Sequence, residues 1–264
     1  MIKKGYVDTK NGQIHYYQAG ENKGNPIIFI HQNVSGGKMY EKTLALLGKK
    51  NWCIALDLPG FGESFEPPPF TSISSLTRYT IEFIDALGID KFHVFGNHTG
   101  AGMAAEIASL LSNRVLSCMM IGALLLTEEQ AVSFREEFSG SVGPSHNAEY
   151  LKATWDYIYN LGGSLDLENM NNEYYASLRA WKARGMIYEC VWDYQFSEFI
   201  EKIKCPTLLM CSPDDVLYLG HKNTAVAMPN AKAVDIKGGN FEPYFDAPGI
   251  YQNVLEFFSD NAFI

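Results

Sequence analysis

The run Gly96-Asn97-His98-Thr99-Gly100 places one histidine between two glycines in a polar break between apolar segments. An imidazole in such a place can accept a proton from water or from an acidic substrate, which makes it a general base. A neutral imidazole is also a nucleophile toward acyl groups. His98 is therefore the first candidate for chemistry in this chain, as a base or as a nucleophile.

The same run has the frame Gly-x-Ser-x-Gly, with histidine in the place of serine. In that motif the central residue lies on a strained turn from a strand to a helix, and the glycines let the two elements approach closely. The flanking segments fit this context: residues 92–95 (Phe-His-Val-Phe) predict a short buried strand, and residues 101–108 predict a helix with a small-residue face.

Further elements alternate along the chain. Apolar runs predict strands at 13–17, 26–30, 52–56, 115–121 and 206–211, and helical periodicity appears at 39–47 and 76–87. Continuous apolar runs are typical of a mainly parallel sheet covered by helices. Between 124 and 203 the pattern changes to polar helices rich in Tyr and Trp, which indicates a helical cap inserted between two strands. We expect a core of residues 1–123 and 204–264, and a cap of residues 124–203.

Composition restricts the partners. The 264 residues are 47% hydrophobic and 13% aromatic, enough for a large core, and the formal net charge is −9 with an isoelectric point near 5.2. This acidity argues against nucleic acid and against anionic membrane surfaces. The five cysteines are widely spaced in apolar runs, and no segment is long enough to span a bilayer. We expect a soluble cytoplasmic protein.

Several motifs together resemble the capped α/β-hydrolase superfamily, especially its small esterases, C–C hydrolases, dehalogenases and epoxide hydrolases. They are Phe29-Ile30-His31-Gln32-Asn33, Asp57-Leu58-Pro59-Gly60-Phe61-Gly62-Glu63-Ser64, the run around His98, Pro206-Thr207-Leu208-Leu209-Met210 and Asp215. The resemblance covers about residues 5–258. It implies a mainly parallel eight-stranded sheet with helices on both faces, a helical cap, and hydrolase-like chemistry.

The chain departs from the family pattern at functional positions. The nucleophile, normally Ser, Asp or Cys, is His98, and the late Gly-Gly-His-Phe segment is Gly238-Gly239-Asn240-Phe241. The acid remains where the resemblance puts it, at Asp215. Serine acylation and the aspartyl-ester route are therefore excluded. We expect His98 to fill the space vacated at Asn240, to be held by Asn240 or Asp215, and to act as a general base.

The resemblance also implies an oxyanion hole. The N–H of Thr99 would point into it, and Gln32 or Asn33 would complete it. The substrate predicted from the aromatic cap is a small, largely apolar carbonyl compound, processed by hydrolysis or by a lyase reaction without a cofactor. Direct attack by His98 is a second hypothesis, for which Glu242 and Tyr244 stand near enough to Asn240 to be considered as activators of water.

A third hypothesis is a small-molecule binding protein or receptor that keeps the pocket and does no chemistry. A structural role is favoured for His31, His15 and His93, and Asp214 is expected to be a solvated neighbour of Asp215. At helical spacing, Tyr150, Thr154, Trp155, Ile158 and Tyr159 are expected to share one face of a cap helix. We predict no metal site, because the histidines lack Cys, Asp or Glu at ligand spacing. A homodimer is an open alternative.

Overall fold

The structure is a computed structural model, and it describes residues 1–70, 72–138 and 143–263. Eight strands form one sheet in the order β1-β2-β4-β3-β5-β6-β7-β8. The strands are β1 (Lys3–Thr9), β2 (Gly12–Ala19), β3 (Ile27–Ile30), β4 (Cys53–Leu56), β5 (Phe92–Asn97), β6 (Val115–Ile121), β7 (Thr207–Cys211) and β8 (Lys232–Asp235). The six strands β3 to β8 run parallel to one another, while β2 pairs antiparallel with β1 and β4. The predicted eight-stranded, mainly parallel sheet is confirmed.

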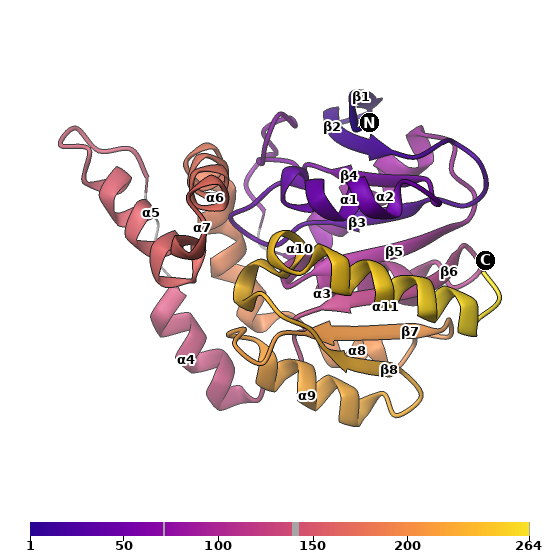
Figure 1. Ribbon diagram of the computed structural model, residues 1–264. Coiled ribbons are helices and arrows are strands. Elements are labelled where there is room, and N and C mark those ends of the chain that lie inside the picture. The colour runs from indigo at the N-terminus through magenta and orange to yellow at the C-terminus, as the bar shows by residue number, and fades with distance from the viewer. Residues whose placement is uncertain (71, 139–142, 264) are drawn as a thin grey trace.

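Helices cover both faces of the sheet (Figure 1). The helices of the first and last parts of the chain are α1 (Glu41–Leu47), α2 (Ile73–Ala86), α3 (Thr99–Leu110), α9 (Tyr218–Ala227), α10 (Glu242–Phe245) and α11 (Ala247–Asp260). One face packs against α1 and α11, and the other packs against α2, α3 and α8. The predicted strands and helices of the core all appear, and β1 and β8 complete the two edges.

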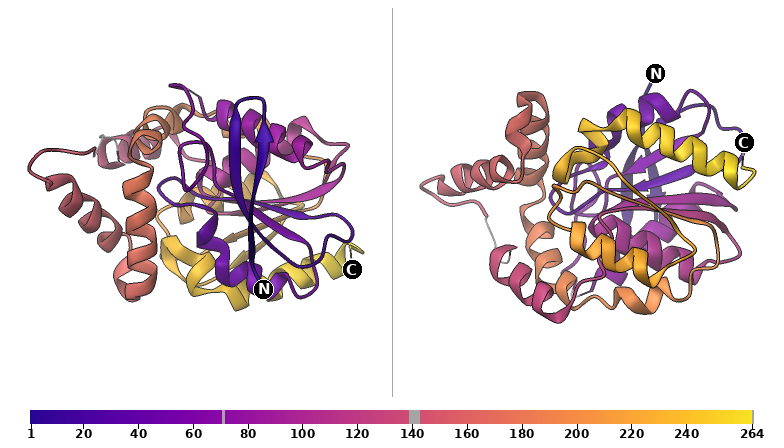
Figure 2. Two further views of the ribbon diagram at one scale, coloured as in Figure 1. Left: turned by 90° about the horizontal axis from the view of Figure 1, so that it is seen from above. Right: turned by 60° about the horizontal axis from the view of Figure 1, so that its bottom comes forward.

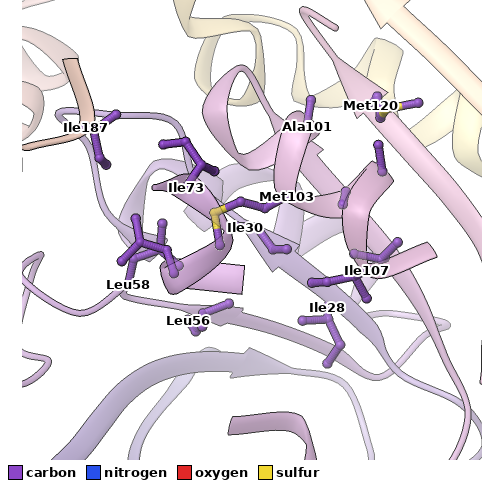
Figure 3. Close-up of a cluster of buried hydrophobic side chains, with 14 of the residues drawn as sticks. Ile28, Ile30, Leu56, Leu58, Ile73, Ala101, Met103, Ile107, Met120 and Ile187 are labelled. Atoms are coloured by element: carbon purple, nitrogen blue, oxygen red, sulfur yellow. The ribbon is translucent and has the colours of Figure 1, made fainter. Parts of the chain in front are cut away.

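The core follows from the apolar runs. All four residues of β3 and all four of β4 are buried, as are all six of β5, because helices cover both of their faces. Figure 3 shows the cluster in which Ile28 and Ile30 of β3 meet Met103 and Ile107 of α3. This packing fixes β3, β5 and α3 relative to one another.

The segment between β6 and β7 is helical. It contains α4 (Glu128–Phe138), α5 (Glu149–Asn160), α6 (Leu167–Arg179), α7 (Trp181–Cys190) and α8 (Phe196–Ile200). Helices α4 to α7 lie together beside the sheet, at the left of Figure 1 and in both views of Figure 2. Helix α8 instead packs against α3, so the segment predicted as the cap also includes a helix that covers the sheet.

On α5 the predicted shared face is realised only in part. Thr154 and Ile158 are buried, whereas Tyr159 is 54% exposed. Tyr157, which the pattern did not assign to that face, lines a cavity together with His98. None of the helices within the described residues is long and apolar enough to cross a bilayer.

Candidate active site

His98 forms a strained turn between β5 and α3, with φ 48° and ψ −113°. A non-glycine residue at positive φ costs of order 1–3 kcal/mol. The flanking glycines are required by close approach: a Cβ on Gly96 would lie 2.0 Å from the Gly100 carbonyl oxygen, and one on Gly100 would lie 2.1 Å from that of Ile30. The strand–turn–helix context predicted for this run is therefore confirmed.

The imidazole of His98 is hydrogen-bonded to Asp215. Its Nε2 lies 2.6 Å from Oδ2 of Asp215, whose side chain is fully buried, while the His98 side chain is 14% exposed. The other carboxylate oxygen, Oδ1, accepts the N–H of Leu217 at 2.6 Å. Because an ionised carboxylate only accepts, Nε2 carries the shared proton, and Nδ1 holds the free lone pair of a neutral ring.

A glycine beyond β6 makes room for this ring. Gly122 has φ 61°, and a Cβ there would lie 2.4 Å from Cδ2 and 2.8 Å from Nε2 of His98. Any side chain at position 122 would push the imidazole away from Asp215. Nothing in the sequence marks Gly122 as part of the site, since a glycine after a buried strand has many ordinary explanations.

Asn240 does not hold the imidazole. Its Oδ1 accepts the N–H of Val216 at 3.1 Å, and its Nδ2 donates to the carbonyl oxygen of Leu161 at 2.9 Å. Of the two partners expected for His98, the structure supplies Asp215, and Asn240 instead joins the loop after β7 to the end of α5. The reason is that both polar atoms of the Asn240 side chain, Oδ1 and Nδ2, are already hydrogen-bonded to backbone groups.

The residues expected at an oxyanion hole lie around one cavity. Thr99, Gln32 and Asn33 line it together with His98 and Asn240. Thr99 is the first residue of α3, so the helix supplies no acceptor for its N–H. The side chains of the other two are occupied: Nε2 of Gln32 donates to the Asn240 carbonyl at 3.2 Å, and Oδ1 of Asn33 accepts the N–H of Val34 at 2.9 Å.

The cavity is small and largely aromatic. Its volume is about 60 Å³, which is room for about two water molecules. Aromatic side chains from three cap segments close it: Phe134, Phe138, Tyr157, Tyr188 and Trp192. The hydroxyls of Tyr157 and Tyr188 bond each other, and burial raises the pKa of both phenols. The sequence predicted that some cap aromatics line the cleft, but it missed Phe134 and Phe138, because α4 is polar and has no buried face.

A larger groove of about 1130 Å³ lies elsewhere, between α6 and the core segment around α1. Its lining includes several lysines, acids and amides, such as Lys38, Lys42 and Glu168, and contains no histidine. The smaller cavity is the better candidate for an active site, since it alone combines an oriented base with an apolar wall among the hollows of the described residues.

Glu242 lies beside the pair of His98 and Asp215. The Nε2 or Nδ1 of His98 and one carboxylate oxygen each of Asp215 and Glu242 lie within 4.8 Å of one another, the one such three-residue group of possible metal ligands in the described ranges. Burial, followed by the charge of Asp215, raises the pKa of Glu242 well above its usual value. Two buried carboxyl groups therefore lie beside the imidazole of His98.

Other residues named from the sequence have structural surroundings. His31 is buried, its Nδ1 donates to the Gln32 carbonyl at 2.8 Å, and its Nε2 accepts the N–H of Leu58 at 3.0 Å. Both ring nitrogens are thus used, and burial lowers the pKa of His31. Asp214 is exposed, as expected. His15 is more than a packing residue, because its Nδ1 lies 2.8 Å from Oδ2 of Asp57.

Comparisons with known proteins agree with this architecture. A family model described as the alpha/beta hydrolase fold matches residues 25–142. The 2-hydroxy-6-oxo-6-(2'-aminophenyl)hexa-2,4-dienoic acid hydrolase of Metapseudomonas resinovorans is 24% identical over 227 residues, which are 80% of this chain and 74% of that protein. Haloalkane dehalogenase 2 of Mycobacterium tuberculosis (strain ATCC 25618 / H37Rv) is 32% identical over 111 residues, 42% of this chain and 38% of that one.

Among solved structures, the enol-lactonase from Burkholderia xenovorans LB400 superposes with a TM-score of 0.82 over 97% of this chain and 100% of that one, at 17% identity. At that identity the likeness concerns the fold. Together, the sheet order, the turn at His98 and these similarities show that the chain has the α/β-hydrolase fold.

Proposed function

We propose that this chain is a hydrolase in which His98, held by Asp215, acts as a general base toward water and cleaves a small, largely apolar ester or lactone. The observation that carries the proposal is the 2.6 Å contact between Nε2 of His98 and Asp215 at the strained turn where the superfamily keeps its nucleophile. The hydrolase names of the relatives support the reaction class. The apolar character of the substrate is inferred from the aromatic lining of the cavity, which at about 60 Å³ must widen to admit an aryl ester.

The reaction divides into two proton transfers. Nδ1 of His98 accepts a proton from a water molecule while the water oxygen bonds to the carbonyl carbon, and the π electrons move onto the carbonyl oxygen. The tetrahedral oxyanion then re-forms its double bond and expels the alkoxide or enolate, which takes the proton back from Nδ1. The products are one carboxylic acid and one alcohol or enol, with His98 neutral again.

Each neighbouring group has a part in this sequence. Asp215 stabilises the imidazolium that exists between the two transfers. The N–H of Thr99, at the start of α3, faces developing negative charge at the positive end of a helix, where a preorganised donor is worth about 10²–10³ in rate. The aromatic wall favours an apolar acyl or leaving group.

The leaving group must be a good one. Asn240 stands where the family pattern has its catalytic histidine, and it is hydrogen-bonded to backbone groups. Among the described residues, His98 is therefore the one histidine of the cavity that can protonate a leaving group. A substrate whose leaving group is already stabilised, such as an enolate or a phenolate, needs only the one proton that His98 returns. Enol esters, aryl esters and enol lactones are therefore the first compounds to test.

The experiment compares the wild-type protein with His98→Asn on a series of aryl acetates, enol acetates and enol lactones. Asn tolerates positive φ, so the turn is kept while the base is removed. We expect turnover by the wild type and a loss of about 10²–10⁴-fold in kcat for His98→Asn. His93→Asn, a buried histidine remote from the cavity, is the matched control and keeps kcat.

Two further outcomes discriminate the remaining hypotheses. An acyl group trapped on His98, seen as a mass increase of the protein during turnover, would show that His98 acts as a nucleophile and not as a general base. Absence of turnover with tight ligand binding in both wild type and His98→Asn would make the chain a small-molecule binding protein. Either result contradicts the proposed role of His98 as a base toward water.

A further inference from the structure

Glu242 is a buried acid with no cation beside it. It is the first residue of α10, its side chain is completely inaccessible, and no lysine, arginine or histidine of the described residues forms an ion pair with it. One oxygen, Oε1, accepts the N–H of Ser212 at 3.2 Å, and the other, Oε2, has no hydrogen-bond partner among the described residues. A buried ionised carboxylate in such surroundings is strongly unfavourable.

Apart from the ring of His98, the groups that face Glu242 from the neighbouring elements are also acids or weak acids. They are Asp215 in the loop after β7, Cys211 at the end of β7 and Tyr40 before α1. Burial, then the charge of Asp215, raises the pKa of Glu242 well above its usual value, which favours its protonated form. That proton needs an acceptor, and the carboxylate of Asp215 is the nearby anion.

Asp215 has room for this additional donor. A carboxylate offers about four lone-pair positions. Two donors are already in place, Nε2 of His98 on Oδ2 and the N–H of Leu217 on Oδ1, each at 2.6 Å. A third donor would restrict the orientation of the carboxylate further.

We propose that Glu242 is a positioning residue of this site: as a neutral carboxylic acid it donates a hydrogen bond from Oε2 to Asp215, so that His98 faces a single, shared negative charge. The inference rests on the proposed function, because it assigns Glu242 its part in keeping His98 a usable base. In this arrangement a series of hydrogen bonds extends from the partly exposed imidazole of His98 through Asp215 to the fully buried Glu242.

The charge state decides whether His98 can act. If Glu242 were ionised, two carboxylates within 4.8 Å of the ring would favour the imidazolium form, which has no lone pair for a proton. A neutral Glu242 removes one of these charges while it keeps Asp215 oriented. Glu242 thus helps to keep His98 usable as a base in a site where the usual catalytic histidine is replaced by Asn240.

The test is the titration of His98, followed by NMR of the labelled imidazole in the whole protein without substrate. Glu242→Gln replaces one neutral donor by another, so the His98 pKa is expected to move by less than about half a pH unit. Glu242→Leu removes the donor and concentrates the charge on Asp215, so the His98 pKa rises. Glu106→Gln, which changes a buried carboxylate of α3 that bonds Thr77 and Tyr194, is the control and leaves the titration unchanged.

Two results would overturn the proposal. A fall of more than about one pH unit in Glu242→Gln means that an ionised Glu242 had been stabilising the imidazolium. An unchanged titration in Glu242→Leu means that the side chain does not act on Asp215. Neither result depends on turnover, so a wild-type protein that hydrolyses nothing would defeat the proposed function and leave this inference to the titration. With turnover, Glu242→Gln is expected to keep a larger share of kcat than Glu242→Leu, at similar KM.

Discussion

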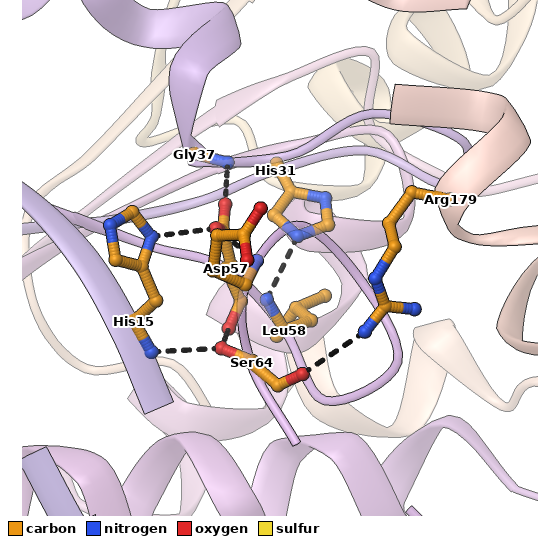
Figure 4. A network of polar contacts seen from close by, with 8 residues as sticks. His15, His31, Gly37, Asp57, Leu58, Ser64 and Arg179 are labelled. Carbon is orange, nitrogen blue, oxygen red and sulfur yellow. Dashed lines mark hydrogen bonds and ion pairs between the residues drawn. The ribbon is translucent and has the colours of Figure 1, made fainter. Parts of the chain in front are cut away.

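His98 and His15 each hydrogen-bond a buried aspartate, at 2.6 Å to Asp215 and at 2.8 Å to Asp57, but the two rings differ in access. His98 lines the small cavity, whereas in the other pair only Asp57 borders a hollow, the larger groove. Figure 4 shows the second pair, enclosed by Ser64, Gly37 and His31. There the histidine and aspartate side chains are both 2% exposed, and the aspartate also accepts the N–H groups of Gly37 and Glu63 at 2.7 and 3.1 Å. A histidine–carboxylate contact is therefore not in itself an active site.

The backbone makes the difference between the pairs. His15 lies inside the regular strand β2 and helps to attach the loop after β4 to the antiparallel edge of the sheet. His98 lies on a turn at positive φ, at the carboxyl end of the central parallel strand β5. In open α/β sheets ligands bind at these strand ends. The pair of His15 and Asp57 stabilises the fold, and the pair of His98 and Asp215 holds a ring with one free nitrogen against the small cavity.

Activity should separate the two pairs most strongly. His98→Asn is expected to lower kcat by about 10²–10⁴-fold, because the base is removed. His15→Asn should leave kcat per folded molecule within about twofold, since its ring does not reach the cavity. Steady-state rates on an enol ester, normalised to the folded fraction from circular dichroism, give the comparison. Equal losses in both variants would mean that the cavity is not the place of turnover.

Stability should separate them in the opposite order. His15→Ala leaves Asp57 buried without its ring partner, and breaking a buried pair costs about 3–5 kcal/mol. His98→Ala should cost less, because Asp215 keeps the Leu217 N–H and water can enter from the cavity. Urea unfolding of the two variants at one pH measures both costs. A larger loss for His98→Ala would show that the pair at the cavity is the main structural one.

The sequence allowed the eight-stranded sheet and the turn at His98 to be predicted, because buried parallel strands are continuous apolar runs and the glycines at 96 and 100 have local geometric causes. It also predicted that Asp215 is one of two partners for the ring. It could not choose between Asp215 and Asn240, because the choice depends on the backbone groups of Val216 and Leu161 that occupy Asn240. The pair of His15 and Asp57 and the aromatic residues of α4 depend on contacts between distant segments and were missed.

Glu173 on α6 is a third buried acid that can be compared with Asp57 and Asp215, and it has no histidine partner among the described residues. Burial raises its pKa to about 7, although Ser35 and Lys38 counteract the shift, whereas in Asp57 the His15 and backbone hydrogen bonds outweigh burial and lower the pKa. With a folded-state pKa above the unfolded value of 4.5, the contribution of Glu173 to stability is complete below pH 4.5 and is lost as the pH rises through 7.

Glu173→Gln should remove that loss. Relative to the wild type, the variant is expected to gain about 2–3 kcal/mol of unfolding free energy between pH 5 and pH 8. Denaturant titrations at the two pH values measure it, and Glu168→Gln, an exposed acid of the same helix, is the control. A pH dependence that is equally steep in Glu173→Gln and in the wild type would place the titrating group elsewhere.

The smallest expected effect concerns backbone strain at positive φ, which occurs at His98 and also at Ala148, a residue outside the site. Ala148 precedes α5 on the surface with φ 59°. Asn adopts this conformation more readily than Ala, so Ala148→Asn should raise the unfolding free energy by about 0.5–1 kcal/mol and leave kcat unchanged. The same relief at His98→Asn should not appear as a gain, because Asp215 loses its ring partner at the same time. If thermal unfolding showed equal gains in the two variants, the contact with Asp215 would contribute nothing to the folded state, and the strained turn would be kept for catalysis alone.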